Sequence, residues 1–389
     1  MLDAGCWTLV LMISLFLPAL AQAQIRTGAE QTELYYSLLK DKRIGVVANQ
    51  ASMVHKISIV KSLVNQGFQV KVIFSPEHGY DIFGEAGEGR KDHTEQGSGI
   101  RVISLYGEKK KPAGADLSGL DVILFDIQDV GVRFYTYIST LTLVMDACAE
   151  HGVLMVVLDR PNPNGFYMDG PVLQRSQQSF VGMHPVPVVY GMTIGEYARM
   201  VNGEGWLECG KRCDLRVIPM EGYTHSVRYS LPERPSPNLP DQTSILLYPS
   251  LCLFEGTPVS VGRGTAFPFQ VYGHPSLEYG AFSFTPVSIP GQALHPPLEG
   301  VECRGEDLRG YYADHPGDSG KIILGWLIKA YKSWNGNGAF FTPYFNKLAG
   351  NETLKEQIIR GVPEEEIRES WRPGIAKFMK IREKYLLYP

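Results

Sequence analysis

The stretch Val122-Ile123-Leu124-Phe125-Asp126-Ile127-Gln128-Asp129 decides the fold of this chain, because an apolar run ends abruptly in acids and an amide. A continuous apolar run of this length is typical of a strand buried on both faces, as in a parallel sheet covered by helices. In such sheets ligands bind beyond the carboxyl ends of the strands. The polar residues therefore mark a candidate site.

The same arrangement recurs along the first half of the chain. The other apolar runs and the polar sequence that follows them are Ile44–Ala48 before Asn49-Gln50, Val70–Phe74 before Ser75-Pro76-Glu77-His78-Gly79, Val102–Leu105 before Tyr106-Gly107, and Leu154–Leu158 before Asp159-Arg160-Pro161-Asn162-Pro163. Helical patterns alternate with these runs, so we expect an α/β fold with a Rossmann-like doubly wound parallel sheet. One edge of that sheet would carry acids, a histidine, arginines, amides and tyrosines.

Helices are predicted around the strands. They cover Thr32–Leu39, about Ser58–Gln66, about Ser139–Glu150, and a segment through Val201 that a capping box at Thr193 opens. Leu215–Pro219 is predicted as the last strand. Near residue 234 the chain becomes rich in proline and then in short Gly-, Phe- and Pro-rich segments. Helices are predicted again at about 319–333, 352–360 and 364–388. We expect a catalytic domain over 24–234 and a smaller α+β domain over 235–389 that completes the cleft.

Composition excludes several function classes. The chain has 389 residues, 44% of them hydrophobic, and a formal charge of −4, so electrostatics give no reason to expect nucleic acid as a partner. The glycines do not form a dinucleotide or phosphate-loop motif, and no metal-ligand spacing of Cys and His occurs. We therefore expect neither a cofactor nor a metal.

The N-terminus is predicted to be a signal peptide over residues 1–23. Trp7–Leu20 is apolar, and Ala21-Gln22-Ala23 has the small-x-small pattern of a cleavage site. The segment before the apolar run lacks Lys and Arg, which departs from the usual pattern. No later stretch is long and apolar enough for a membrane span, so we expect an exported protein, periplasmic or secreted.

Glu77 is the first candidate catalytic residue. A buried strand fixes its backbone, and a carboxylic acid in a partly apolar pocket can protonate a leaving oxygen. Its neighbour His78 would point the other way on an extended chain, so it joins the site only if the backbone turns there. The alternative is that Glu77 caps the following loop.

The strand end after Phe125 supplies further candidates. Asp126 is a candidate second catalytic carboxylate, with Asp129 next, and Gln128 would share the face of Asp126. Alternatively, these acids cap a helix or pair with a buried arginine. In the following segment Arg133 could grip a carboxylate, while Tyr135 and Tyr137 could stack on sugar rings or pack in the core.

The remaining candidates come from two regions. Asp159, Arg160 and Asn162 follow a predicted strand, where the first two could bind ligand or simply pair to hold the loop. In the second domain, Glu255, Arg263 and His274 lie in glycine-containing loops. Such residues could approach a ligand closely or be structural.

Several long strings in the chain resemble those of one known family. They are SPEHG with GEAGE, SLYG, DVILFDIQDVGVRFYTYISTL, VLDRPNPNG, SFVGMHPVPVVYGMTIGE, PSPNLP and FEGTPVSVGRGT. They resemble the bacterial exo-β-N-acetylmuramidase family, the NamZ-like glycoside hydrolases, over about residues 40–389. The resemblance implies hydrolysis of terminal β-1,4-linked N-acetylmuramic acid (MurNAc) from peptidoglycan fragments such as MurNAc-GlcNAc, during cell-wall turnover or recycling. It also implies that Glu77 is the catalytic glutamate of the SPEHG string.

The implied substrate suggests roles for the other candidates. MurNAc carries a lactyl carboxylate that Arg133, Arg160 or Arg263 could hold, and an acetamido group that Asn162 could bind. The second catalytic group stays open between Asp126, Asp129, Glu85, Glu88, Glu255 and a substrate-assisted route. The alternatives to this function are an exported amino-sugar- or muropeptide-binding protein, and an esterase or amidase. No GxSxG motif supports the latter.

Overall fold

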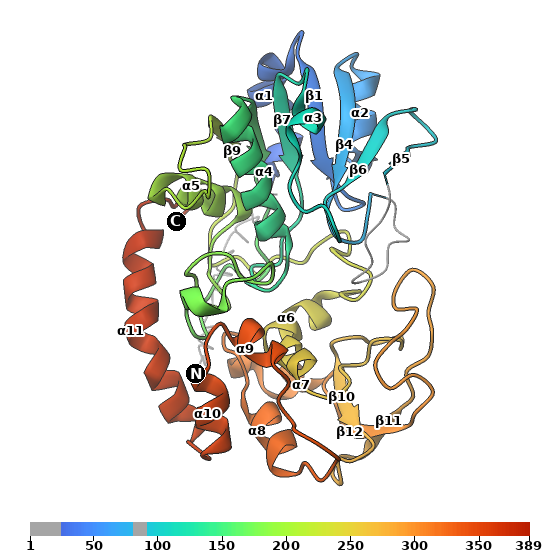
Figure 1. The fold of residues 1–389 in the computed structure, drawn as a ribbon, viewed down its shortest axis with the longest axis vertical. Coiled ribbons are helices and arrows are strands. Elements are labelled where there is room, and N and C mark those ends of the chain that lie inside the picture. The colour runs from blue at the N-terminus through green and yellow to red at the C-terminus, as the bar shows by residue number, and fades with distance from the viewer. Residues whose placement is uncertain (1–24, 81–91) are drawn as a thin grey trace, which may run out of the picture.

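The computed structural model describes residues 25–80 and 92–389. Its first part is built on a seven-stranded sheet in the order β5-β6-β4-β1-β7-β8-β9 (Figure 1). The strands are β1 (Arg43–Ala48), β4 (Gln69–Ser75), β5 (His93–Thr94), β6 (Arg101–Ser104), β7 (Val122–Asp126), β8 (Leu154–Leu158) and β9 (Leu215–Ile218). A small hairpin, β2 (Met53–Val54) with β3 (Ile57–Ser58), follows β1. All the predicted strands of the sheet are therefore confirmed.

The sheet has the doubly wound order expected from the sequence. Apart from β5, which pairs antiparallel with β6, all neighbouring strands are parallel. Counting only these parallel strands in chain order, the arrangement across the sheet is 3-2-1-4-5-6. The order reverses between β1 and β7, and such a reversal opens a crevice at the carboxyl ends of the strands.

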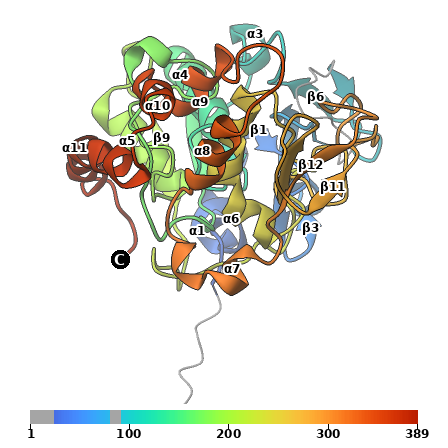
Figure 2. The ribbon, with the colours of Figure 1, turned by 90° about the horizontal axis from the view of Figure 1, so that it is seen from below.

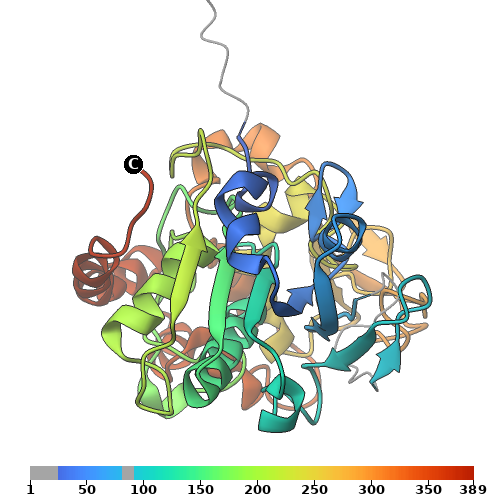
Figure 3. The same ribbon diagram turned by 90° about the horizontal axis from the view of Figure 1, so that it is seen from above.

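Burial on both faces explains why the strands are continuously apolar. In β7, Val122 and Leu124 belong to one core cluster, while Ile123 and Phe125 belong to the other. Helices α1 (Thr32–Leu39) and α2 (Ile59–Asn65) supply side chains to the first cluster, and α4 (Tyr137–His151) and α5 (Ile194–Glu204) to the second. Figure 3 shows helices on both sides of the sheet. A short helix, α3 (Gly114–Leu117), precedes β7.

The second part is the smaller α+β domain that the sequence predicted. It contains a three-stranded antiparallel sheet in the order β10-β12-β11, which lies beside the helices when the molecule is seen from below (Figure 2). Its elements are α6 (Gln242–Leu251), β10 (Val271–His274), β11 (Phe282–Phe284), β12 (Cys303–Asp307), α7 (Tyr311–Asp314), α8 (Gly325–Lys332), α9 (Tyr344–Ala349) and α10 (Thr353–Ile359). The helix predicted from residue 319 therefore begins later, at Gly325.

The last helix, α11 (Glu364–Arg382), returns to the first part of the molecule. It runs along one edge of the molecule, from the second part to the first (Figure 1). Arg382 donates hydrogen bonds to the carbonyl of Gly191 at 2.6 and 2.8 Å. Beyond the helix, the Tyr388 hydroxyl donates to Asp159 Oδ2 at 2.6 Å. The end of the chain thus fastens the two parts together.

Some sequence predictions concern residues that the structure does not describe. The predicted signal peptide and the candidates Glu85 and Glu88 lie outside the described ranges. Within those ranges, no helix has the length and apolar character needed to cross a membrane. The cysteines of the described ranges are all free thiols.

Candidate active site

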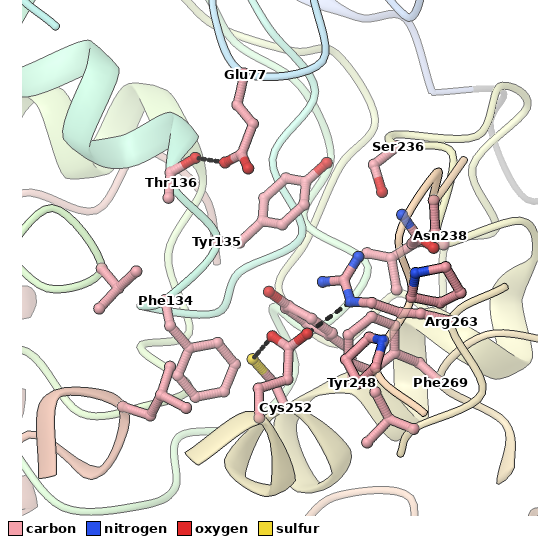
Figure 4. Close-up of a pocket in the computed structure, with 18 of the residues that line it drawn as sticks. Glu77, Phe134, Tyr135, Thr136, Ser236, Asn238, Tyr248, Cys252, Arg263 and Phe269 are labelled. Carbon is pink, nitrogen blue, oxygen red and sulfur yellow. Dashed lines mark hydrogen bonds and ion pairs between the residues drawn. The ribbon is translucent and has the colours of Figure 1, made fainter. Parts of the chain in front are cut away.

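A cavity of about 540 Å³ lies where the sheet faces the second domain. The first domain contributes Glu77, Tyr106 and Thr136 to its lining, and the second contributes Glu255 and Arg263. The segments that carry these residues follow β4, β6 and α6 or precede α4. Figure 4 shows the side chains around the open space. The cavity therefore combines the carboxyl edge of the sheet with loops from the other domain.

Glu77 is held in place by the start of α4. Thr136, which precedes the helix, donates a hydrogen bond from Oγ1 to Glu77 Oε2 at 2.6 Å (Figure 4). The hydroxyl of Tyr137 donates to the backbone carbonyl of Glu77 at 3.4 Å. A carboxylate at a helix N-terminus is also favoured by the helix dipole. The side chain is half-buried, so it is oriented and still open to the cavity.

The backbone turns sharply directly after Glu77. His78 has a φ of 72° and Gly79 a φ of 84°, both in the left-handed region. A non-glycine residue there is strained, and such strain is found most often at functional sites. Because of this turn, His78 lines the same cavity as Glu77 instead of pointing away from it. The structure therefore brings the two predicted residues together.

Aromatic side chains form much of the cavity wall. Tyr135 lines it, and its hydroxyl donates to the carbonyl of Pro235 at 2.9 Å. Its ring lies edge-on to Tyr248, with the ring centroids 6.0 Å apart. Burial, together with the neighbouring Glu77 carboxylate, raises the pKa of Tyr106, so this hydroxyl stays protonated. Rings with polar tips suit a ligand that has apolar faces and many hydroxyls, as sugars do.

The second domain contributes an ion pair. Arg263 Nε lies 2.6 Å from Glu255 Oε1, and Cys252 Sγ donates to Glu255 Oε2 at 3.4 Å. The guanidinium carbon lies 4.9 Å from the centroid of the Phe269 ring. Burial opposes the charge, but the Glu255 carboxylate raises the pKa of Arg263, which therefore stays cationic. Both residues line the cavity, as the sequence predicted for ligand-binding residues.

Asp126 and Arg160 form a buried ion pair with each other. Arg160 Nε and Nη2 lie 2.6 and 2.8 Å from the two carboxylate oxygens of Asp126, whose side chain is fully buried. Neither residue lines the cavity that contains Glu77. The physical reason is that β7 and β8 are neighbours, so residues at their carboxyl ends face each other. Asp126 is therefore placed as a structural acid, and not as the partner of Glu77 that the sequence suggested.

Other candidates after β7 and β8 also satisfy groups within the protein. Gln128 donates to the carbonyl of Pro161 at 2.7 Å, and Asn162 donates to the carbonyl of Met192 at 2.8 Å. Asp129 accepts from Gly131 N at 2.7 Å, and burial raises its pKa to about 6. These three side chains are outside the cavity lining, because they build the loops that support it.

Arg133, Tyr137 and Asp159 are also buried in the protein interior. Arg133 donates to four backbone carbonyls, those of Pro171, Val186, Leu348 and Ala349. Tyr137 receives a hydrogen bond from Asn49 at 3.0 Å. Asp159 accepts from Thr193, Gly195 and Tyr388, and burial raises its pKa to about 7. None of the three lines the cavity.

His274 lies outside the cavity as well, and several lining residues were not predicted. The ring of His274 packs on Trp334 at 4.7 Å, and burial lowers its pKa. The unpredicted residues most relevant to the site are Tyr106, Thr136, Ser236, Asn238, Tyr248, Cys252, Phe269 and Tyr344. Thr136 lies between two predicted candidates, so its place before a helix was the signal that could have identified it.

Comparison with known proteins gives a consistent result across the chain. The family model "Exo-beta-N-acetylmuramidase NamZ, N-terminal" matches residues 44–243, and the corresponding C-terminal model matches residues 246–388. The chain is 35% identical over 380 residues to the peptidoglycan beta-N-acetylmuramidase NamZ of Bacillus subtilis (strain 168), covering 91% of this chain and 89% of that protein.

Two crystal structures of DUF1343 family proteins from Bacteroides fragilis NCTC 9343 have the same fold. One superposes with a TM-score of 0.86 at 44% identity, covering 94% of this chain and 99% of the other. The second superposes with a TM-score of 0.75 at 26% identity, again covering 94% and 99%. The two-domain architecture is therefore shared along nearly the whole length of these chains.

Proposed function

The chain belongs to the exo-β-N-acetylmuramidase NamZ family, and from this premise we propose that it releases terminal MurNAc from peptidoglycan fragments. It is a glycosidase, and we propose the MurNAc-GlcNAc unit as its substrate. The observation that carries this proposal is the position of Glu77 in the cavity, oriented by Thr136 and surrounded by aromatic rings. This arrangement supports protonation of a glycosidic oxygen by Glu77.

The second half of the reaction uses a different group from the one the sequence suggested. Among the described residues that line the cavity, the carboxylates are Glu77 and Glu255. Both oxygens of Glu255 already have partners, Arg263 and Cys252. We therefore assign the attack on the anomeric carbon to water or to the acetamido oxygen of the substrate, as in substrate-assisted glycosidases.

We also propose that the protein works outside the cytoplasm. The support is the apolar segment Trp7–Leu20 followed by Ala21-Gln22-Ala23, which has the pattern of a signal peptide. Peptidoglycan lies in that same compartment. Fractionation of cells that produce the full chain, with N-terminal sequencing of the mature protein, should find it cleaved after Ala23. An uncleaved protein in the cytoplasm would contradict this localisation.

The role of Glu77 is tested by comparing two leaving groups. In Glu77→Gln, turnover of the MurNAc-GlcNAc disaccharide should fall about 10²- to 10⁴-fold, because the sugar leaving group needs a proton. Turnover of 4-nitrophenyl β-MurNAc should fall much less, since nitrophenolate leaves without protonation. Steady-state kinetics with both substrates give the two ratios.

Glu369→Gln is a matched control, because that side chain is exposed on α11. It should leave both activities unchanged. Equal losses on the two substrates in Glu77→Gln would show that Glu77 is not the general acid. If the wild type binds MurNAc and cleaves neither substrate, the chain is a sugar-binding protein instead.

A further inference from the structure

We propose that Arg263 is the residue that selects MurNAc, by binding the carboxylate of its lactyl group. The inference rests on the proposed function and extends it to the choice of substrate. MurNAc differs from N-acetylglucosamine (GlcNAc) by a lactyl ether on O3, whose carboxylate is the only charge on the sugar. An enzyme that distinguishes the two sugars by charge needs a cation in the cavity.

The structure separates Arg263 from the other two arginines suggested by the sequence. Arg160 forms hydrogen bonds with both carboxylate oxygens of Asp126. Arg133 is fully buried, and both of its terminal nitrogens donate to backbone carbonyls. Arg263 lines the cavity, and within the described residues it is the arginine that does so. A carboxylate that enters this space therefore meets Arg263.

Arg263 also keeps donors that the protein does not use. Its Nε points to Glu255, but Nη1 is buried without a hydrogen-bond partner in the described ranges. A buried donor without a partner is costly, and ligand-binding sites are a common reason for keeping one. Two N–H groups at the end of a guanidinium match the two oxygens of a carboxylate. In Figure 4 this end of Arg263 points into the open part of the cavity.

The loop around Arg263 is built to present it. Gly262 and Gly264 have φ values of 79° and 76°, which an L side chain adopts with strain. A Cβ at Gly262 would lie 2.7 Å from Val271 Cγ2, and one at Gly264 would lie 2.5 Å from the carbonyl oxygen of Val287. The loop therefore packs tightly against its surroundings on both sides of the arginine. This packing fixes the backbone that carries the guanidinium.

Phe269 supports the guanidinium from one face. It has a φ of 55°, which is unusual for a side chain of this size, and its ring is buried against Arg263. Such strain persists only where the surrounding structure enforces it. Glu255 fixes the guanidinium at Nε and so leaves the terminal N–H groups toward the cavity. Glu255 and Phe269 are thus positioning residues for Arg263.

The test uses three substrates that differ at one position. They are 4-nitrophenyl β-MurNAc, its lactyl methyl ester, and 4-nitrophenyl β-GlcNAc. The ester keeps the size of the lactyl group but removes its charge. The wild type should prefer the acid to the ester by about 100-fold or more in kcat/KM, because the site would leave buried donors unpaired with the ester.

In Arg263→Gln this preference should collapse. The kcat/KM for the acid should fall about 100-fold, mainly through KM, while that for the ester changes by no more than about 3-fold. Arg263→Lys keeps the charge without the planar fork and should lie between the two. It also serves as the second variant if Arg263→Gln does not fold.

Arg309→Gln is a matched control. Arg309 also pairs with an acid, Asp307, and lies over the ring of Phe267 at 4.7 Å, but it is not part of the cavity lining. Its replacement should leave the acid-to-ester ratio unchanged. Equal losses on acid and ester in the Arg263 variants, or an unchanged ratio, would overturn the inference.

Failure of the proposed function gives a different result. If the wild type cleaves none of the substrates, calorimetric binding of MurNAc and of its methyl ester decides the matter. Loss of the preference for MurNAc in Arg263→Gln would still support the inference, and no preference in the wild type would overturn it. The two claims are therefore tested separately.

Discussion

At the scale of single residues, the position of Glu77 follows from its neighbours in the chain. The residues of β4 up to Ser75 are buried and fixed, and Pro76 restricts the backbone before Glu77. The left-handed conformations of His78 and Gly79 then turn the chain away. The carboxyl group is left at the end of a rigid strand, where Thr136 can reach it.

Thr136 should matter for catalysis without taking part in the chemistry. Removing its hydroxyl in Thr136→Val leaves Glu77 without the 2.6 Å hydrogen bond that orients it, so kcat should fall about 10-fold with little change in KM. Thr136→Ser keeps the hydroxyl and should restore most of the activity. Steady-state kinetics on the MurNAc-GlcNAc disaccharide measure both. A normal kcat in Thr136→Val would remove the residue from the account.

The sequence could predict Glu77 and Arg263 but not how the other candidates are used. A strand end or a glycine-flanked loop is visible in sequence, so residues there can be identified as candidates. Whether two such residues neutralise each other depends on which strands are neighbours. Asp126 and Arg160 pair because β7 lies beside β8, and strand order is a property of the folded sheet.

At the scale of elements, long apolar patterns were predictable and short irregular ones were not. The strands of the parallel sheet are buried on both faces, so their sequences are distinctive. Helix α6 contains Pro249, and the strands β10, β11 and β12 are short and lie in Gly- and Phe-rich sequence. Their form comes from packing against the rest of the second domain, which local sequence does not reveal.

Helix α9 shows how an element of one domain is held by the other. Its final carbonyls, those of Leu348 and Ala349, accept hydrogen bonds of 2.9 Å from Arg133 of the first domain. The same helix contributes Tyr344 and Leu348 to the cavity lining. The cationic group also lies where the negative end of the helix dipole favours it. Arg133 thus links the sheet domain to one wall of the cavity.

Arg133→Met should therefore destabilise the protein strongly. It keeps the length of the side chain but leaves four buried carbonyls without their donor, so we expect a loss of about 3 kcal/mol and a Tm lower by about 5 °C. Thermal unfolding measures the change. Arg372→Met is the control, because its side chain is 74% exposed, and it should leave Tm unchanged. A Tm of Arg133→Met equal to that of the wild type would contradict this role.

At the scale of the whole molecule, the active cavity depends on both domains. The sheet domain supplies Glu77 and the second domain supplies Arg263, so neither contains the complete site. The end of the chain reinforces this arrangement, because the tail beyond α11 places Tyr388 on Asp159 inside the first domain. A cavity of about 540 Å³ is suited to a ligand of a few sugar units at most, and not to a long glycan lying across it.

The measurement that tests the central claim most directly is product analysis on a defined glycan. A tetrasaccharide of alternating MurNAc and GlcNAc, with MurNAc at its non-reducing end, would be incubated with the protein and sampled by mass spectrometry. The account predicts that free MurNAc and a trisaccharide starting with GlcNAc appear first, and that a tetrasaccharide with GlcNAc at that end is not cleaved. Release of disaccharides, or cleavage of the GlcNAc-ended glycan, would contradict it.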